Sequence, residues 1–318
     1  MYGKGKRVHI SVALDRCIEL LTPAIVNSKT PVIVDATLGL GGHSFELLNR
    51  FPNLTLIGID RDKSAIAKAS EKLARFQDRI HIAHSVFDRF EEVVKSFGFE
   101  KIDGALFDLG VSSMQLDQSE RGFSYSQDAP LDMRMDQSSG ITAEEIVNNW
   151  SHADLTRILR VYGEEKFAPR IADFIIKERA IAPITSTATL ATLVKAAIPA
   201  AARRTGGNPS KRTFQALRIA VNHELEVIEN ALPQALHLLN VGGRVVVLSF
   251  QSLEDRIVKE IFTQVSQSTA PRNLPVELPE HAPKFKLIAK GESASAKEIA
   301  ENPRAQSVRI RAIERVAA

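Results

Sequence analysis

Between residues 31 and 110, short apolar runs alternate with amphipathic helical patterns. The runs are almost continuously apolar, which predicts strands that are buried on both faces. Parallel strands joined by helices satisfy that burial, so we expect an α/β protein with helices on both faces of a parallel sheet. The expected strands are PVIVDA, LTLIGID, RIHIAHS, KIDGALFDLG and GGRVVVLSF, with KFKLIAK and QSVRIRAIERV as a closing pair.

After Gly110 the alternation gives way to a polar segment and then to helical patterns alone. We expect a discontinuous domain, residues 1–111 and 212–318, that is interrupted by an all-helical insertion at residues 112–211. A long helix is expected from Thr213, and Pro233 is expected to kink or divide it. Ser252 and Asp255 are spaced as a capping box for the helix that follows GGRVVVLSF.

Composition restricts the class of protein only broadly. The chain has 318 residues, enough for one large domain or two moderate ones, and a net charge of +3 that identifies no partner. Its single cysteine, Cys17, cannot form an internal disulfide, which fits a reducing compartment. There is no signal-peptide pattern and no apolar stretch of about 18 residues. We therefore expect a cytoplasmic protein without a membrane partner, and the histidine spacing predicts no metal site.

The segment DATLGLGGHS, residues 35–44, joins the first expected strand to a helix. Glycines in such a turn let a ligand approach the backbone, and the helix N-terminus offers unpaired N–H groups. Gly39 and Gly41 fit the first and third positions of a dinucleotide-binding fingerprint, but Ser44 replaces its last glycine. A tight turn without a ligand is the alternative interpretation.

Two acids discriminate between candidate ligands. Asp35 ends the first strand, where it would repel a pyrophosphate and attract a sulfonium or ammonium group. Asp60 ends the second strand, about twenty residues beyond the glycines, where a carboxylate can accept both hydroxyls of a ribose. A helix cap is the alternative role for Asp60. S-adenosylmethionine accounts for Asp35, the glycines and Asp60 together, whereas NAD accounts for only two of the three.

Several longer segments occur in a characteristic order. They are DATLGLGGHS, GIDRD, DLGVSSMQLD, ERGFS, PLDMRMD, YGEEKFAPRIA, RTFQALRIAVNHEL, SLEDRIVK and ENPRAQS. Through them the chain resembles the bacterial 16S ribosomal RNA (cytosine-N4)-methyltransferase family over residues 9–315. The resemblance implies a Rossmann-like class I S-adenosylmethionine-dependent methyltransferase fold with a helical, substrate-recognising insertion. It also implies methyl transfer to the exocyclic N4 amine of one cytidine in the decoding region of 16S rRNA, within the small ribosomal subunit.

The resemblance also assigns site residues. One position departs from the family, which usually has a histidine before SLEDRIVK where this chain has Gln251. That exchange indicates hydrogen bonding or positioning in place of proton acceptance, or a weaker enzyme. Phe87 is one of the cofactor contacts that the resemblance implies, and the alternative is that it is an ordinary core residue. The implied cofactor contacts are Gly41, Gly42, His43, Asp60, Phe87, Asp108 and Gln115.

Methylation of an amine needs positioning more than covalent help. We expect Asp108, Ser112 and Ser113 to position the target amine by accepting hydrogen bonds from it. Methylation at cytosine C5 generally uses a covalent cysteine, and Cys17 lies far in sequence from the strand ends. Two alternatives stay open: an amino-methyltransferase acting on DNA or another RNA, and a non-catalytic, cofactor-binding ribosome assembly factor.

An acid-free stretch from Ala180 to His223 contains six basic residues. Phosphate contacts to RNA depend on such charges, although a solvated basic face has the same pattern. Glycines and a proline near its middle predict a mobile loop. The sequence fixes no oligomeric state, and a homodimer stays open. The residues expected to contact RNA are Arg203, Arg204, Lys211 and Arg212.

Overall fold

The computed structural model describes most of the chain as two compact units. One unit is Met1–Gly110 together with Leu225–Ala318, and the other is Val111–Glu224. We call them the sheet unit and the helical unit. The helical unit ends later than residue 211 because helix α10 (Lys211–Asn222) packs against helices α6 and α7 of that unit. The described residues are 11–112, 114–115, 118–125, 127–204, 208–268, 270 and 281–318.

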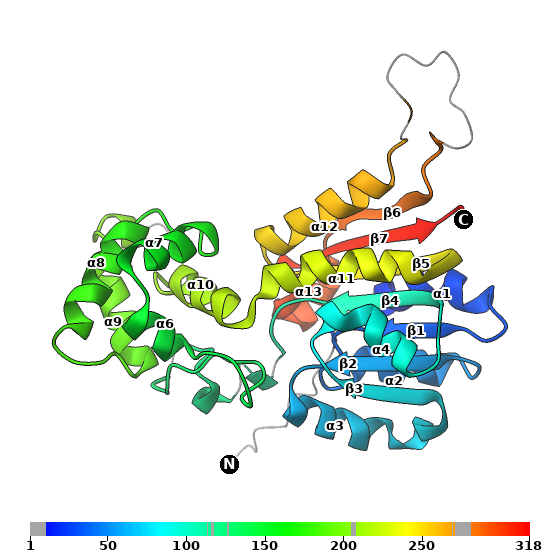
Figure 1. The fold of residues 1–318 in the computed structure, drawn as a ribbon, viewed down its shortest axis with the longest axis horizontal. Coiled ribbons are helices and arrows are strands. Elements are labelled where there is room, and N and C mark those ends of the chain that lie inside the picture. The colour runs from blue at the N-terminus through cyan, green and yellow to red at the C-terminus, as the bar shows by residue number, and fades with distance from the viewer. Residues whose placement is uncertain are drawn as a thin grey trace. The chain divides into compact units, whose positions relative to one another are not determined.

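A seven-stranded sheet with the order β3-β2-β1-β4-β5-β7-β6 forms the centre of the sheet unit (Figure 1). Strands β1 to β5 are parallel, and β7 runs antiparallel between β5 and β6. This order confirms the Rossmann-like α/β class. It also places the point where the strand order reverses between β1 and β4, which is where open α/β sheets bind ligands. The strands are β1 (Val32–Asp35), β2 (Thr55–Asp60), β3 (Ile80–His84), β4 (Ile102–Asp108), β5 (Leu239–Ser249), β6 (Phe285–Glu292) and β7 (Arg309–Arg315).

Helices cover both faces of this sheet, as the continuous apolar strands predict (Figure 1). Strand β1 shows why, because Ile33 belongs to one apolar core while Val32 and Val34 belong to the other. One face packs against α1 (Leu14–Val26), α2 (Gly42–Arg50) and α3 (Lys63–Leu73), and the other against α4 (Phe90–Ser96), α11 (Glu224–Leu238) and α12 (Ser252–Val265). A short helix, α13 (Ala296–Glu301), precedes β7.

The helical unit has an apolar core of its own. Three of its helices begin at side-chain caps, because Thr142, Ser151 and Ser186 each accept a hydrogen bond from a backbone N–H of the first turn. In its described residues, strand-like pairing is limited to an isolated bridge between Pro130 and Ser186. Its helices are α6 (Ala143–Asn149), α7 (His152–Val161), α8 (Ala168–Arg179), α9 (Thr187–Ala197) and α10.

Two local predictions were wrong. The expected long helix is divided at His223, whose left-handed φ of 53° separates α10 from α11, while Pro233 lies inside α11. At the start of α12 the Glu254 carboxylate accepts the backbone N–H of Gln251 at 3.2 Å, so the helix begins one residue earlier than the expected pair Ser252 and Asp255. Asp255 instead accepts hydrogen bonds from Arg311 of β7 at 2.7 and 2.9 Å.

The length and polarity of the helices also bear on membranes. Among the residues that the structure describes, no helix is both long and apolar enough to span a membrane.

Candidate active site

The turn after β1 requires its glycines. Gly39 and Gly41 have left-handed φ angles of 51° and 69°, which strain residues that carry a Cβ. A Cβ on Gly41 would also lie 2.9 Å from the Leu73 side chain of α3. The backbone N–H of Leu38 donates to the Ile59 carbonyl of β2 at 2.9 Å. The turn is therefore held against β2 and α3, and α2 begins directly after it.

Asp60 holds this turn from the end of β2. Its carboxylate accepts the backbone N–H of Gly39 at 2.7 Å and that of Asp62 at 2.8 Å. Burial raises the pKa of Asp60, and these two hydrogen bonds oppose the shift. Asp62, whose side chain accepts from Ser64 N at 3.0 Å, is the cap of α3, so the cap role considered for Asp60 was wrong. Because a carboxylate has about four acceptor sites, Asp60 can still accept ribose hydroxyls.

Asp35 lies buried at the end of β1, with 1% of its surface exposed. It accepts a hydrogen bond from Ser44 Oγ at 2.6 Å and another from Thr37 N at 3.2 Å. Burial raises the pKa of Asp35 to about 6. Ser44 therefore replaces the last fingerprint glycine for a structural reason, since it ties the first turn of α2 to this acid.

Asp108 is the more accessible acid at the same edge, and its side chain is 29% exposed. Its backbone N–H donates to Thr37 Oγ at 2.7 Å, which joins β4 to the glycine turn. His43 Nδ1 lies 3.9 Å from Asp108 Oδ2, and His43 Nε2 lies 3.1 Å from the Val12 carbonyl. Burial raises the pKa of Asp108 to about 8, and the negative charges of Asp35 and Glu254 add to the shift.

Glu254, in the first turn of α12, is a site residue that sequence reasoning missed. It is 1% exposed, and its carboxylate accepts the backbone N–H groups of Phe250 and Gln251 at 2.9 and 3.2 Å. A Cβ on Gly110, after β4, would lie 3.9 Å from Glu254 Oε1. Its position in SLEDRIVK, three residues after Gln251, was the available signal.

Carboxyl groups thus cluster where the strands end. In the part of the chain that the structure describes, no Lys or Arg lies within ion-pair distance of Asp35, Asp60 or Asp108, although the charge of Arg61 acts on Asp60 from farther away. Such a site favours a cation. The left-handed glycine turn, the ribose acceptor Asp60 and this excess of carboxylates together fit S-adenosylmethionine.

Other residues expected at the cofactor site have less specific surroundings. Phe87 follows β3 in a 3-10 turn and packs edge-on against Phe107, with ring centroids 5.7 Å apart. Gln115 and Ser112 belong to the helical unit, where Ser112 N donates to Gln115 Oε1 at 3.1 Å and Gln115 N donates to Ser112 Oγ at 3.3 Å. Ser113 lies outside the described residues.

The basic residues of the helical unit differ in their exposure and in their hydrogen-bond partners. Lys211 and Arg212 are exposed in the first turn of α10, where Arg212 Nη1 donates to the Glu164 carbonyl at 3.0 Å. Arg203 is half-buried, and the Arg204 side chain lies outside the described residues. Arg218, another basic residue of the acid-free stretch, forms two hydrogen bonds with Glu224 at 2.8 and 2.9 Å.

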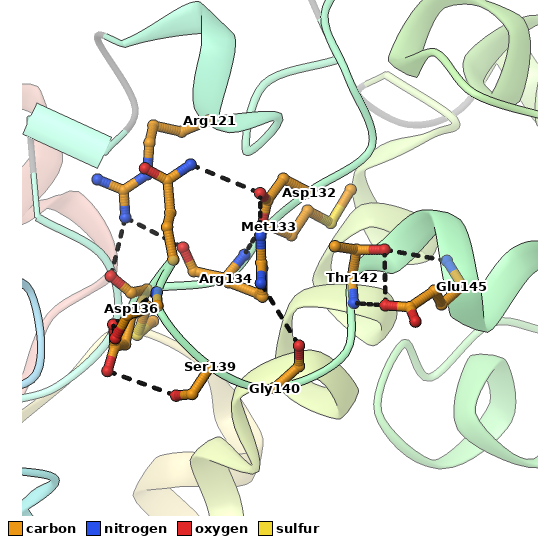
Figure 2. Close-up of polar contacts among 12 residues, drawn as sticks. Arg121, Asp132, Met133, Arg134, Asp136, Ser139, Gly140, Thr142 and Glu145 are labelled. Carbon is orange, nitrogen blue, oxygen red and sulfur yellow. Dashed lines mark hydrogen bonds and ion pairs between the residues drawn. The ribbon is translucent and has the colours of Figure 1, made fainter.

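The PLDMRMD segment of the helical unit is a network of polar contacts (Figure 2). Buried Arg121 donates to the carbonyls of Arg134 and Met135 at 3.0 and 2.9 Å. Arg134 in turn donates to both carboxylate oxygens of Asp132. Met133 has a left-handed φ of 61°, and its N–H donates to the Arg121 carbonyl at 3.0 Å. This network fixes the segment before α6.

Comparison with known proteins identifies the family. The model of the MraW methylase family matches residues 6–316. Ribosomal RNA small subunit methyltransferase H of Salinispora arenicola is 56% identical over 315 residues, which cover 99% of this chain and 85% of that protein. The proteins of the same name from Mycolicibacterium smegmatis and Kocuria rhizophila are 56% and 52% identical, covering 97% of this chain in both cases and 84% and 94% of theirs. With a class I methyltransferase fold and S-adenosylmethionine as its cofactor, the chain belongs to the MraW methylase family.

Proposed function

We propose that this protein transfers a methyl group from S-adenosylmethionine to the exocyclic N4 amine of a cytidine in the decoding region of 16S rRNA. The observation that carries the proposal is the group of carboxyl side chains beside the glycine turn with no Lys or Arg at ion-pair distance among the described residues, where a cationic cofactor with a ribose fits. The names of the relatives favour small-subunit ribosomal RNA as the substrate. The sequence resemblance favours the cytidine amine.

S-adenosylmethionine supplies an electrophilic methyl group on a sulfonium, and the residues of the chain then have to position the partners. We assign the ribose hydroxyls to Asp60. The lone pair of the cytosine amine is delocalised into the ring, so an acceptor on an amine N–H helps to localise it. Asp108, Ser112 and Ser113 are the candidates for this positioning role. The amine releases one proton to water after it accepts the methyl group.

The burial of Cys17 favours methylation of a cytosine amine over methylation at cytosine C5. It is 1% exposed within helix α1, and burial raises the pKa of its thiol well above the ordinary value. Methylation at cytosine C5 needs a thiolate that can reach the ring. The only cysteine of the chain is therefore poorly suited to that reaction.

The helical unit supplies the surface that we assign to RNA. Lys211 and Arg212 occupy the first turn of α10, which contains no acidic residue, although positive charge at a helix N-terminus is unfavourable. Phosphate binding would offset that cost. We include Arg203 and Arg204 in this RNA-binding set and assign substrate recognition to the insertion. We place the protein in the cytoplasm, where the small subunit is assembled.

The test is methylation of purified small subunits that lack the modification, followed by mass spectrometry of the digested nucleosides. We expect N4-methylcytidine at one position, and much less of it with Asp60→Ala at limiting cofactor. Methylation at C5, or faster transfer to DNA than to small subunits, would contradict the proposal. Cofactor binding without methylation of any substrate would favour an assembly factor.

A further inference from the structure

Two polar side-chain atoms at the end of β5 are buried without a partner. They are Ser249 Oγ and Gln251 Oε1, and neither forms a hydrogen bond among the described residues. Ser249 is the last residue of β5, and Gln251 is the residue that precedes α12. Most buried polar atoms in native proteins are hydrogen-bonded, so such exceptions at a strand end suggest a ligand.

The side-chain amide of Gln251 has a defined orientation. Its Nε2 donates to Glu254 Oε1 at 2.8 Å, while Glu254 also accepts the backbone N–H of Gln251. An ionised carboxylate only accepts hydrogen bonds, so the amide nitrogen has to face Glu254. The amide oxygen consequently points away from Glu254, where it is an acceptor without a donor among the described residues.

This acceptor belongs to the same sheet edge as Asp108. In the parallel register, Asp108 of β4 pairs with Leu248 of β5, so Gln251 follows three residues beyond that level. The Glu254 oxygen that binds Gln251 is also the one 3.9 Å from the Cβ position of Gly110, directly after β4. The negative charge of Glu254 contributes to the environment of Asp108. Gln251 is thus anchored beside the acid that we place at the reacting amine.

We propose that the side-chain amide oxygen of Gln251 accepts a hydrogen bond from the exocyclic amine of the target cytosine and positions it. This inference rests on the proposed function. A neutral acceptor suits an amine, because it can hold one N–H without removing a proton. It would also discriminate against uracil, whose O4 is an acceptor and would face the amide oxygen without a hydrogen bond. Gln251 is a positioning residue in this account, and Glu254 orients it.

The first experiment replaces the acceptor with a side chain of similar size. Gln251→Met should lower kcat on small subunits about tenfold at saturating cofactor, the value expected for one lost hydrogen bond in a site. The Kd of S-adenosylmethionine, measured by calorimetry, should stay unchanged. A matched control is Gln234→Met, since Gln234 is fully bonded between Asp88 O and Glu91 N in the same unit. That variant should lose stability and keep its kcat.

A second variant provides a readout that a structural role would not change. In Gln251→His, a neutral imidazole can accept the amine hydrogen bond, whereas a protonated imidazole cannot. The pKa of that histidine should lie above its ordinary value of about 6.5, because the Glu254 carboxylate favours the charged form. Its kcat should therefore fall as the pH decreases through this pKa, relative to wild type in the same buffers.

The outcomes separate this inference from the proposed function. If wild type forms N4-methylcytidine while Gln251→Met keeps full kcat, the role of Gln251 is refuted and the proposed function stands. A pH profile of Gln251→His that matches wild type would also refute it, even if the methionine variant fails to fold. If wild type methylates no cytidine amine, the proposed function fails, and the role of Gln251 fails with it.

Discussion

The carboxyl edge of the sheet and the helical unit treat charged side chains in opposite ways. At the carboxyl edge of the sheet, Asp35 and Asp60 accept hydrogen bonds from backbone N–H or hydroxyl groups and Asp108 lies near His43, with no Lys or Arg at ion-pair distance in the described chain. In the helical unit, Asp132 binds Arg134 and Glu224 binds Arg218. The first arrangement leaves carboxyl groups whose ionised form a cationic ligand would favour, and the second neutralises charge within the fold.

This difference separates residues that serve a ligand from residues that serve stability. An uncompensated buried carboxylate costs stability, so its presence at a strand end favours function. A buried arginine that donates to several backbone carbonyls stabilises its surroundings, and its removal leaves those carbonyls unsatisfied. Substitutions in the two regions should therefore affect different measurements.

The largest effect is expected for Arg121→Ala in the helical unit. It removes hydrogen bonds to the carbonyls of Arg134 and Met135, and should lower the free energy of unfolding by about 2–4 kcal/mol. Chemical denaturation measures this loss, and Arg134→Ala, at a more exposed position, should cost less. The affinity for S-adenosylmethionine should stay unchanged at temperatures where the variant is folded. A loss of affinity in the folded variant would contradict the separation of roles.

The next effect is expected at the sheet edge. Asp60→Ala should weaken S-adenosylmethionine binding about ten- to a hundredfold, because a charged acceptor contributes roughly 1.5–3 kcal/mol. The loss of the Gly39 hydrogen bond acts in the same direction. Titration calorimetry measures this change. Asp62→Ala is the matched control, since loss of a helix cap should cost about 1 kcal/mol of stability and leave affinity largely intact. Unchanged affinity in Asp60→Ala would remove Asp60 from the site.

A smaller effect is expected for the basic residues. Neutralising Arg203, Arg204, Lys211 and Arg212 together should weaken binding to small subunits and leave the cofactor Kd unchanged. Each lost phosphate contact should reduce the log–log salt slope by about 0.7 on single-stranded segments. The measurement is subunit binding across a salt series.

The control for net charge is a second quadruple variant of the sheet unit. Neutralising the exposed residues Lys29, Lys259, Lys286 and Lys297 changes the net charge by the same amount. Its salt slope should stay close to that of wild type. If both quadruple variants change the slope equally, the basic residues of the helical unit form only a solvated face.

The smallest effect on turnover is expected for Cys17→Ser. Amine methylation needs no covalent cysteine, so kcat should stay within about twofold of wild type. Stability should fall by about 1–3 kcal/mol, because a hydroxyl replaces a buried thiol in the apolar core. Loss of turnover in a folded variant that binds the cofactor would require a covalent mechanism.

The strands and the glycine turn could be predicted from the sequence because their signals are local. Continuous apolar runs identified β1, β2 and β4, and an acid ends each of these strands. The partners of those acids could not be predicted, since they depend on tertiary contacts. Ser44 and Thr37, which bind Asp35 and the Asp108 backbone, illustrate this.

Two further differences between the prediction from sequence and the structure have physical reasons. Apolar periodicity continues through His223, so the sequence gives no sign of the left-handed residue that divides α10 from α11. The acid-free stretch ends at His223, one residue before Glu224, which pairs with Arg218. A count of charges along the sequence therefore overestimated the basic residues available for RNA.

The carboxyl groups at the strand ends should bind the cation of S-adenosylmethionine. The most direct test is to measure the proton released when S-adenosylmethionine binds. Burial raises the pKa of Asp108 to about 8, so we expect this group to hold a proton near pH 7 in the free protein. A cation favours the ionised carboxylate, so binding should release a proton and affinity should rise by up to about tenfold per pH unit until the pH passes 8. Calorimetry in buffers of different ionisation enthalpy should show this release for wild type and a clear reduction for Asp108→Asn. Binding without proton release at pH 7, with a pH-independent Kd, would contradict the account.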